Sequence, residues 1–162
     1  YYIEYLRPKQ SRSEMPKSLS NPDARDELLD RLERLKPDAR ARWGRMNATQ
    51  MLAHLVDWMA MADGSLRTAP IKGVLRYPLI KQLAIYWLPF PRNVMTAPEL
   101  LRRKPRDWAL ERENVRQGLL SFESLAATIT WPHHPAFGRM TARAWCVFAY
   151  RHTDHHFRQF GI

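Results

Sequence analysis

Three histidines of this chain have the chemistry and spacing of metal ligands. His152 and His156 lie four residues apart near the C-terminus. If that stretch is helical, both imidazoles project from one face a single turn apart, so they can share one metal ion. Two histidines seldom hold a catalytic divalent ion alone. His54, the only histidine among the first 132 residues, is therefore the candidate third ligand.

A site of this kind would be catalytic rather than purely structural. Three neutral imidazoles leave at least one coordination position for water, a thiolate or a substrate. We hypothesise that the ion lowers the pKa of a bound water or thiol and so supplies a nucleophile near neutral pH. Imidazole ligands favour zinc or nickel here and also admit iron, manganese or copper, so the sequence predicts one divalent ion without fixing its identity.

His54 taken alone also fits a packing role. It lies between Met51 and Leu55 in the apolar stripe of its predicted helix. A single histidine on such a face is more often a hydrogen-bonded core residue than a ligand. The side chains best placed to orient the three rings are Asp57, Asp154 and Gln159. Each of them could equally face solvent or serve only the fold.

The other three histidines have no assigned role at this point. His155 projects from a different helix face than the pair beside it. His133 and His134 are adjacent, so their side chains point apart, and Pro135 restrains the backbone of His134. At most one of these two can therefore reach the site.

Four amphipathic segments predict the scaffold that brings the histidines together. Capping residues and prolines mark helix starts, and apolar stripes recur at helical spacing. The predicted helices cover residues 22–36, 48–63, 106–125 and 142–160. A long crossover separates the second from the third. The fold class is therefore predicted to be all-α, a four-helix bundle whose crossover contains a short extra helix.

The crossover, residues 65–98, carries no acidic side chain and mixes aromatic with aliphatic residues over 77–88. It could form a lid or pocket wall, dock on an anionic membrane, or cover the end of the bundle. We favour the interpretation that the crossover covers the end of the bundle and also lines the pocket. The aromatic side chains expected around the pocket are Trp58, Tyr86 and Trp145.

Length and composition describe one ordinary globular domain. The chain has 162 residues, of which 45% are hydrophobic and 26% charged. Residues 1–14 show no lasting period and are interpreted as an N-terminal extension or a remnant of cloning, which leaves 15–162 as a single metal-binding helical domain. Cys146 is the only cysteine, so no intramolecular disulfide can form, which fits a reducing cytoplasm. No apolar run reaches the roughly 18 residues of a membrane span.

The net charge raises the question of whether the protein binds an acidic partner. The chain carries +10, and residues 65–162 hold 15 basic and 6 acidic side chains. Such a surface could attract nucleic acid, anionic lipid or an acidic substrate. No recognition motif accompanies it, and the basic run at 102–106 lacks interleaved aromatics, so we interpret it as a solvated surface without specific nucleic-acid binding. A homodimer through exposed tryptophans is an arrangement left open.

Two motifs resemble a known family. The first is Trp43-Gly44-Arg45-Met46 followed by a helix with Gln50-Met51-Leu52-Ala53-His54, and the second is His152-Thr153-Asp154-His155-His156-Phe157-Arg158-Gln159-Phe160. Together they resemble the DinB/YfiT-like metalloenzymes, in particular a branch that ends in a similar histidine-rich helix. The resemblance covers about residues 19–162. It implies a four-helix bundle and a divalent metal held by His54, His152 and His156.

The same superfamily includes thiol-dependent S-transferases and related hydrolases or isomerases. The resemblance therefore implies a metal-dependent transferase or hydrolase that acts on a small molecule through a metal-activated thiol or water, with a low-molecular-weight thiol as the implied cosubstrate. It also makes ligation the favoured role of His54. Two alternatives remain: a basic binding module without catalysis, and a protein that sequesters or senses metal. The basic, aromatic crossover departs from the simplest members of the family.

Overall fold

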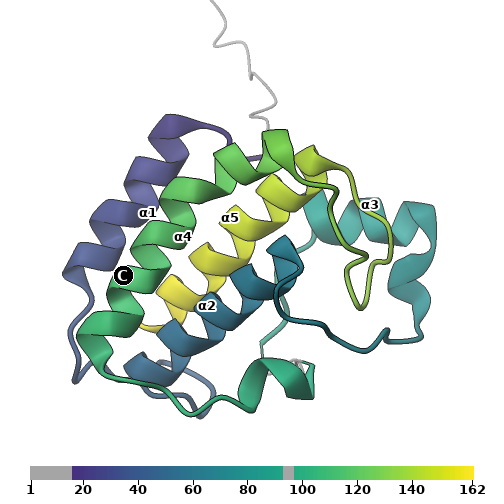
Figure 1. The fold of residues 1–162 in the computed structure, drawn as a ribbon. Helices are drawn as coiled ribbons and strands as arrows, with labels where there is room; N and C mark the ends of the chain where they lie inside the picture. The colour runs from purple at the N-terminus through teal and green to yellow at the C-terminus, as the bar shows by residue number, and fades with distance from the viewer. Residues whose placement is uncertain (1–15, 93–96) are drawn as a thin grey trace, which may run out of the picture.

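A computed structural model describes residues 16–92 and 97–162, and the predicted extension at 1–14 lies outside them (Figure 1). The long helices are α1 (Pro22–Arg34), α2 (Ala48–Asp63), α4 (Trp108–Thr128) and α5 (Ala142–Gln159). A shorter helix, α3 (Pro78–Tyr86), and two 3-10 turns, η1 (Val74–Arg76) and η2 (Pro98–Leu101), lie between α2 and α4. The described residues form no β-strand, which confirms the all-α class.

Helix starts follow the capping signals of the sequence. Asn21 accepts hydrogen bonds from the backbone N–H groups of the first turn of α1, where Pro22 is the first residue. Asn47 and Gln50 form a reciprocal capping box at the start of α2, and Thr141 caps α5. These side chains satisfy amide groups that the helix itself cannot pair. The caps therefore fix where the ligand-bearing helices begin.

Two helix ends differ from the prediction. Helix α1 stops at Arg34, before the predicted residue 36, because Pro37 disfavours a helical conformation in the residue that precedes it. Helix α4 runs to Thr128, beyond the predicted residue 125, since no glycine or proline interrupts the chain there. It also begins at Trp108, with Asp107 as its cap. None of these shifts moves a candidate ligand.

The four long helices pack against one another, with α1 and α2 each lying against both α4 and α5 (Figure 1). Their apolar stripes meet in one core that includes Leu28, Leu32, Leu55, Leu119 and Phe122. Each such side chain stabilises the fold by roughly 1.5–3 kcal/mol relative to an exposed position. Among the described helices, none combines the length and the hydropathy that a bilayer crossing requires.

The crossover folds back onto α5. The Arg151 guanidinium donates hydrogen bonds to carbonyls at the C-terminal end of α3, those of Ala84, Ile85 and Leu88. The carbonyls of Ala84 and Ile85 belong to the last turn of α3, lack helical partners and carry the negative end of the helix dipole, which suits a cation. Ile85 is buried, whereas the opposite side of the crossover exposes large apolar residues: Val74, Tyr77, Leu79, Leu83 and Trp87. The segment thus covers the bundle on one side and meets solvent on the other.

Arg103 joins α2 to α4. Its guanidinium donates two hydrogen bonds to the Glu111 carboxylate on α4, one of 2.7 Å to Asp57 on α2, and one to the Ala53 carbonyl. The Glu111 side chain is 0% exposed. The run at 102–106 was expected to be a solvated surface. For Arg103 that expectation was wrong, because its partners meet it only when the helices are packed.

We predict that Glu111→Gln destabilises the protein by about 2–3 kcal/mol at pH 7, because it removes the fully buried one of the two carboxylates that pair with Arg103. Burial alone would raise the pKa of Glu111, but hydrogen bonds from Arg103 and the Arg106 backbone outweigh it and lower the pKa below its ordinary 4.5. The stabilisation is therefore present above pH 4.5 and is lost as the pH falls further. Urea unfolding between pH 3 and 7 measures both effects.

Glu113→Gln is the control, because Glu113 lies on the same helix and its side chain is 53% exposed. We expect it to change the free energy of unfolding by less than about 0.5 kcal/mol. Equal urea midpoints for the two variants at pH 7 would contradict the assigned role of Glu111.

Candidate metal centre

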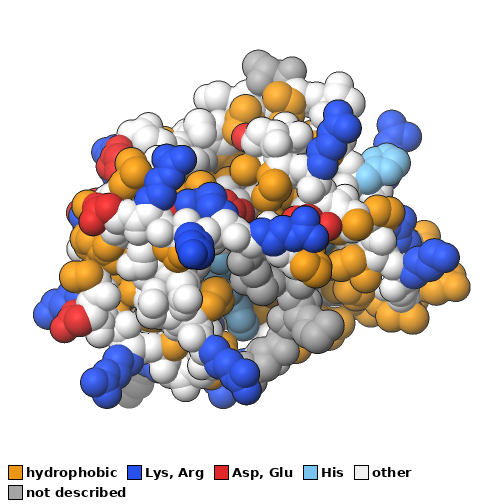
Figure 2. Space-filling view, turned by 60° about the horizontal axis from the view of Figure 1, so that its bottom comes forward, with side chains coloured by type: hydrophobic (Ala, Val, Ile, Leu, Met, Phe, Trp, Pro, Cys, Tyr) orange, Lys and Arg blue, Asp and Glu red, His pale blue; other side chains and the backbone are white. Residues whose placement is uncertain are grey.

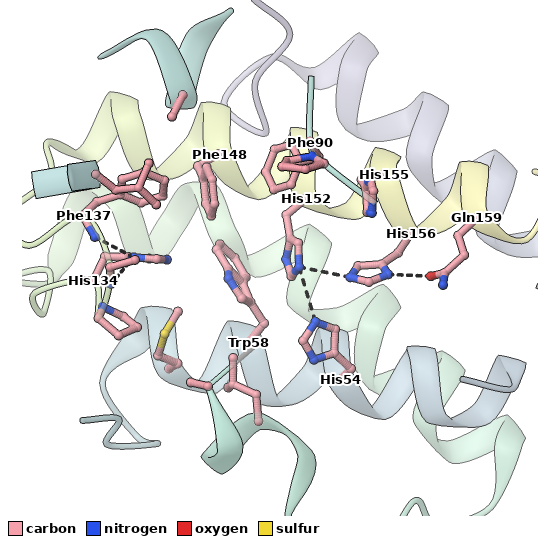
Figure 3. A pocket seen from close by; sticks show the side chains of 18 of the residues that line it. His54, Trp58, Phe90, His134, Phe137, Phe148, His152, His155, His156 and Gln159 are labelled. Carbon is pink, nitrogen blue, oxygen red and sulfur yellow. Dashed lines mark hydrogen bonds between the residues drawn. The ribbon is translucent and has the colours of Figure 1, made fainter. Parts of the chain in front are cut away.

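The packing of α2 beside α5 brings the three predicted ligands together. His54 projects from α2, and His152 and His156 project from successive turns of α5 (Figure 3). The Nε2 atom of His152 lies 3.3 Å from Nε2 of His54 and 3.1 Å from Nε2 of His156. One nitrogen from each ring can be chosen so that all three lie within 4.8 Å of one another, and all three residues are buried.

These distances fit a shared ion. Two imidazole nitrogens bound to one tetrahedral zinc at about 2.0–2.1 Å would lie about 3.4 Å apart. The separations from Nε2 of His152 to Nε2 of His54 and of His156, 3.3 and 3.1 Å, are close to that value. A single ring nitrogen carries either a proton or a lone pair, so Nε2 of His152 cannot donate to one neighbour while accepting from the other. The three histidines could therefore hold a metal ion.

Gln159 fixes the tautomer of His156. Its side-chain amide donates a 2.7 Å hydrogen bond to the Trp43 carbonyl, so its oxygen must face the other way. That oxygen lies 2.9 Å from Nδ1 of His156, which must then carry the ring proton. The lone pair of His156 is consequently on Nε2 and points towards the other two rings, as metal ligation requires.

Asp57 and Asp154 do not orient the rings. Asp57 binds Arg103, and Asp154 accepts hydrogen bonds from Arg31 and Arg158. A guanidinium offers a carboxylate a stronger, charge-assisted hydrogen bond than a neutral imidazole does. Of the three side chains expected to hold the rings, the structure therefore brings only Gln159 into contact with one.

Burial keeps the three rings neutral. It lowers the pKa of His54 to about 4 and, with the neighbouring imidazoles, the pKa of His156 to about 3. Burial and the surrounding histidines also lower the pKa of His152 well below its ordinary value. A neutral imidazole is the form that binds metal, so the site needs no deprotonation near pH 7.

A cavity of about 600 Å³ opens beside the three histidines. In Figure 2 histidine atoms are visible within a hollow whose surroundings carry lysine and arginine side chains. Most of the lining is apolar and comes from α2, α5, the crossover and the loop before α5. The aromatic residues among it are Trp43, Trp58, Phe90, Phe137 and Phe148.

Of the three aromatic residues expected around the pocket, one lies at the cavity wall. Trp58 lines the cavity, but Tyr86 and Trp145 are not among the lining residues. Trp145 is fully buried and stacks on Trp131 in the core. Phe148 was missed, although its place one turn before His152 could have revealed it. Phe90 and Phe137 lie in irregular segments, where no periodicity could have indicated them.

The unassigned histidines take three different positions. His133 is exposed, whereas its neighbour His134 is buried and lines the cavity, so only one of this pair reaches the site. His155 also lines the cavity and packs edge-on against Trp43, with ring centroids 5.7 Å apart. Neither His134 nor His155 belongs to the group of three that can share an ion.

Comparison with known proteins agrees with this geometry. A search of curated proteins and a search of solved structures gave no significant match. A family model described as the DinB superfamily matches residues 22–160, a range that runs from the start of α1 to the end of α5 and contains all three histidines. The chain belongs to the DinB superfamily.

Proposed function

We propose that this protein is a metal-dependent enzyme, a transferase or hydrolase that acts on an apolar small molecule. The observation that carries the proposal is the position of three buried, neutral imidazoles at the wall of a large apolar cavity. A divalent ion held there would act as a Lewis acid and make a bound water or thiol nucleophilic near neutral pH. His54, His152 and His156 would be its ligands, and Gln159 would hold the ring of His156 in its binding tautomer.

A catalytic site fits these residues better than a structural one. Structural zinc sites are closed by four protein ligands, whereas catalytic sites keep a position open. Within the described ranges, the group around His54 supplies three ligands and adjoins the cavity. A molecule in the cavity would therefore lie next to the open position.

A thiol nucleophile must come from outside the chain. Cys146, its only cysteine, is buried away from the cavity lining, and burial raises the pKa of its thiol to about 11. A thiol with that pKa is almost fully protonated at pH 7 and reacts poorly. The reacting group is then water or a low-molecular-weight thiol, which is the cosubstrate class that we infer.

The lining of the cavity does not favour the alternative function, a basic module that binds acidic ligands. Arg45 is the one lysine or arginine among the described lining residues. The basic side chains lie mainly on the outer surface, where they keep the protein soluble without shaping a site. A protein that sequesters metal would need no apolar cavity beside the ligands.

We predict that the protein binds about one divalent ion per chain and that His54→Ala, His152→Ala and His156→Ala each abolish binding at micromolar metal, because two imidazoles hold such an ion poorly. Elemental analysis after equilibrium dialysis with zinc or nickel measures occupancy. His155→Ala is the control, since His155 lies beside the ligands without joining them. Full occupancy in a folded His152→Ala protein would overturn the proposal.

We further predict that Gln159→Leu lowers zinc affinity roughly 10- to 100-fold without abolishing binding, because the ring of His156 loses the acceptor that fixes its tautomer. Competition with a chromogenic chelator measures the affinity. Arg158→Gln, a change on the same helix at a side chain that is 72% exposed and touches no ligand ring, should leave affinity within about 3-fold of wild type. If both variants bind zinc as the wild type does, Gln159 does not tune the site.

A further inference from the structure

His134 is a cavity residue whose ring is held from one side only. It lies in the loop before α5, in a tight turn closed by two backbone hydrogen bonds with Gly138, of 2.9 and 2.8 Å. Gly138 has φ +68°, which a glycine adopts without strain. The same loop anchors the crossover, because the Pro135 carbonyl accepts hydrogen bonds from Ile71 and Arg76. The position of the ring is therefore fixed by the fold.

The turn also fixes the protonation of the ring. Nδ1 of His134 accepts hydrogen bonds from the backbone N–H groups of Ala136 and Phe137, both at 3.2 Å. A nitrogen that faces two N–H donors must present its lone pair, so the ring proton is on Nε2. A doubly protonated ring would turn a third N–H towards these two donors. Consistent with this, burial lowers the pKa of His134 to about 3.

The Nε2–H group faces the cavity without a partner. His134 is only 7% exposed, and no hydrogen bond to its Nε2 is formed within the part of the chain that the structure describes. In Figure 3 this nitrogen points into the space between Trp58 and Phe148. Its nearest ring neighbours, Phe137, Trp145 and Phe148, have centroids 4.8, 5.4 and 5.3 Å from its own. An N–H donor at the cavity wall among such rings is stabilised by any group in the cavity that accepts a hydrogen bond from it.

The cavity therefore has two polar ends. The group of three histidines lies at one, and His134 lies at the other, with the Phe148 ring between them (Figure 3). Phe148 stacks on His152 at 6.2 Å and meets His134 edge-on. A ligand that satisfied both ends would need an apolar body that lies along the Phe148 ring.

We propose that His134 is a substrate-binding residue whose Nε2–H donates a hydrogen bond to a neutral carbonyl oxygen, so that the substrate is an apolar ketone, ester or amide. A carboxylate fits less well, since a neutral imidazole offers it no counter-charge and burying an unpaired charge is far costlier than burying a carbonyl. This inference rests on the proposed function, because the reaction itself would take place at the three histidines. The hydrogen bond from His134 does not depend on that reaction.

Two substitutions separate the two ring nitrogens. In His134→Asn the amide oxygen can take the place of Nδ1 and keep the turn, but the donor into the cavity is lost. In His134→Gln the amide NH₂ can take the place of Nε2–H, while the turn loses its acceptor. If His134 serves only the turn, asparagine can replace it without loss of function. If His134 binds the substrate, glutamine can replace it and asparagine cannot.

The probes are propiophenone, an aryl ketone, and propylbenzene, its hydrocarbon counterpart, bound to chelator-treated protein and followed by tryptophan fluorescence. We expect the ratio of the ketone Kd to the hydrocarbon Kd to rise roughly 2- to 10-fold in His134→Asn, the range of one net hydrogen bond, and to stay near wild type in His134→Gln. Circular dichroism establishes that both variants are folded.

An unchanged ratio in folded His134→Asn overturns the inference, and so does an equal rise in both variants, which would assign the effect to the shape of the ring. Because the metal is removed, the result does not depend on the three ligands. Failure of the proposed function would appear instead as a wild-type protein that binds no zinc.

Discussion

Burying three imidazoles against one another costs the folded chain free energy that an ion shared by their lone pairs would return. Water can hydrogen-bond these rings in the unfolded chain, whereas in the fold the Nε2 atoms of His54 and His156 face one more nitrogen, that of His152. An unmade hydrogen bond of a buried polar group costs about 1–3 kcal/mol. The helices must therefore be held together by other contacts, and the site depends on how firmly they are held.

Two such contacts involve residues close to the ligands in the sequence. Asp57, three residues after His54, binds Arg103, and Asp154, two residues before His156, binds Arg31. Arg31 also donates to the carbonyl of Ile162, so it ties α1 to the end of the chain. Each ligand-bearing helix thus carries, within three residues of a ligand, a carboxylate that is held in an ion pair. These ion pairs stabilise the packing that brings the three rings close together, although they do not contact the rings.

Local signals were enough to predict the frame of the site. Asn47 and Thr141 marked the starts of α2 and α5, and the four-residue spacing of His152 and His156 put both on one face. Gln159 followed from its place three residues after His156. The cavity could not be predicted in the same way, because Phe90 and Phe137 reach it from irregular segments. Arg103 was missed for a related reason, since its partners are 46 and 8 residues away along the chain and meet it only after packing.

The hydrogen-bond relay behind His156 ends on the peptide oxygen of Trp43 rather than on a side chain. Every amino acid brings the same oxygen, so the tautomer of His156 is insensitive to which residue stands at position 43. It is sensitive to where the backbone runs. One residue added to or removed from the link between α1 and α2 would swing that oxygen away and release the ring, although every ligand remained in place. The tautomer of His156 therefore depends on the length of the link between α1 and α2. A comparison of residue identities alone would not detect this dependence.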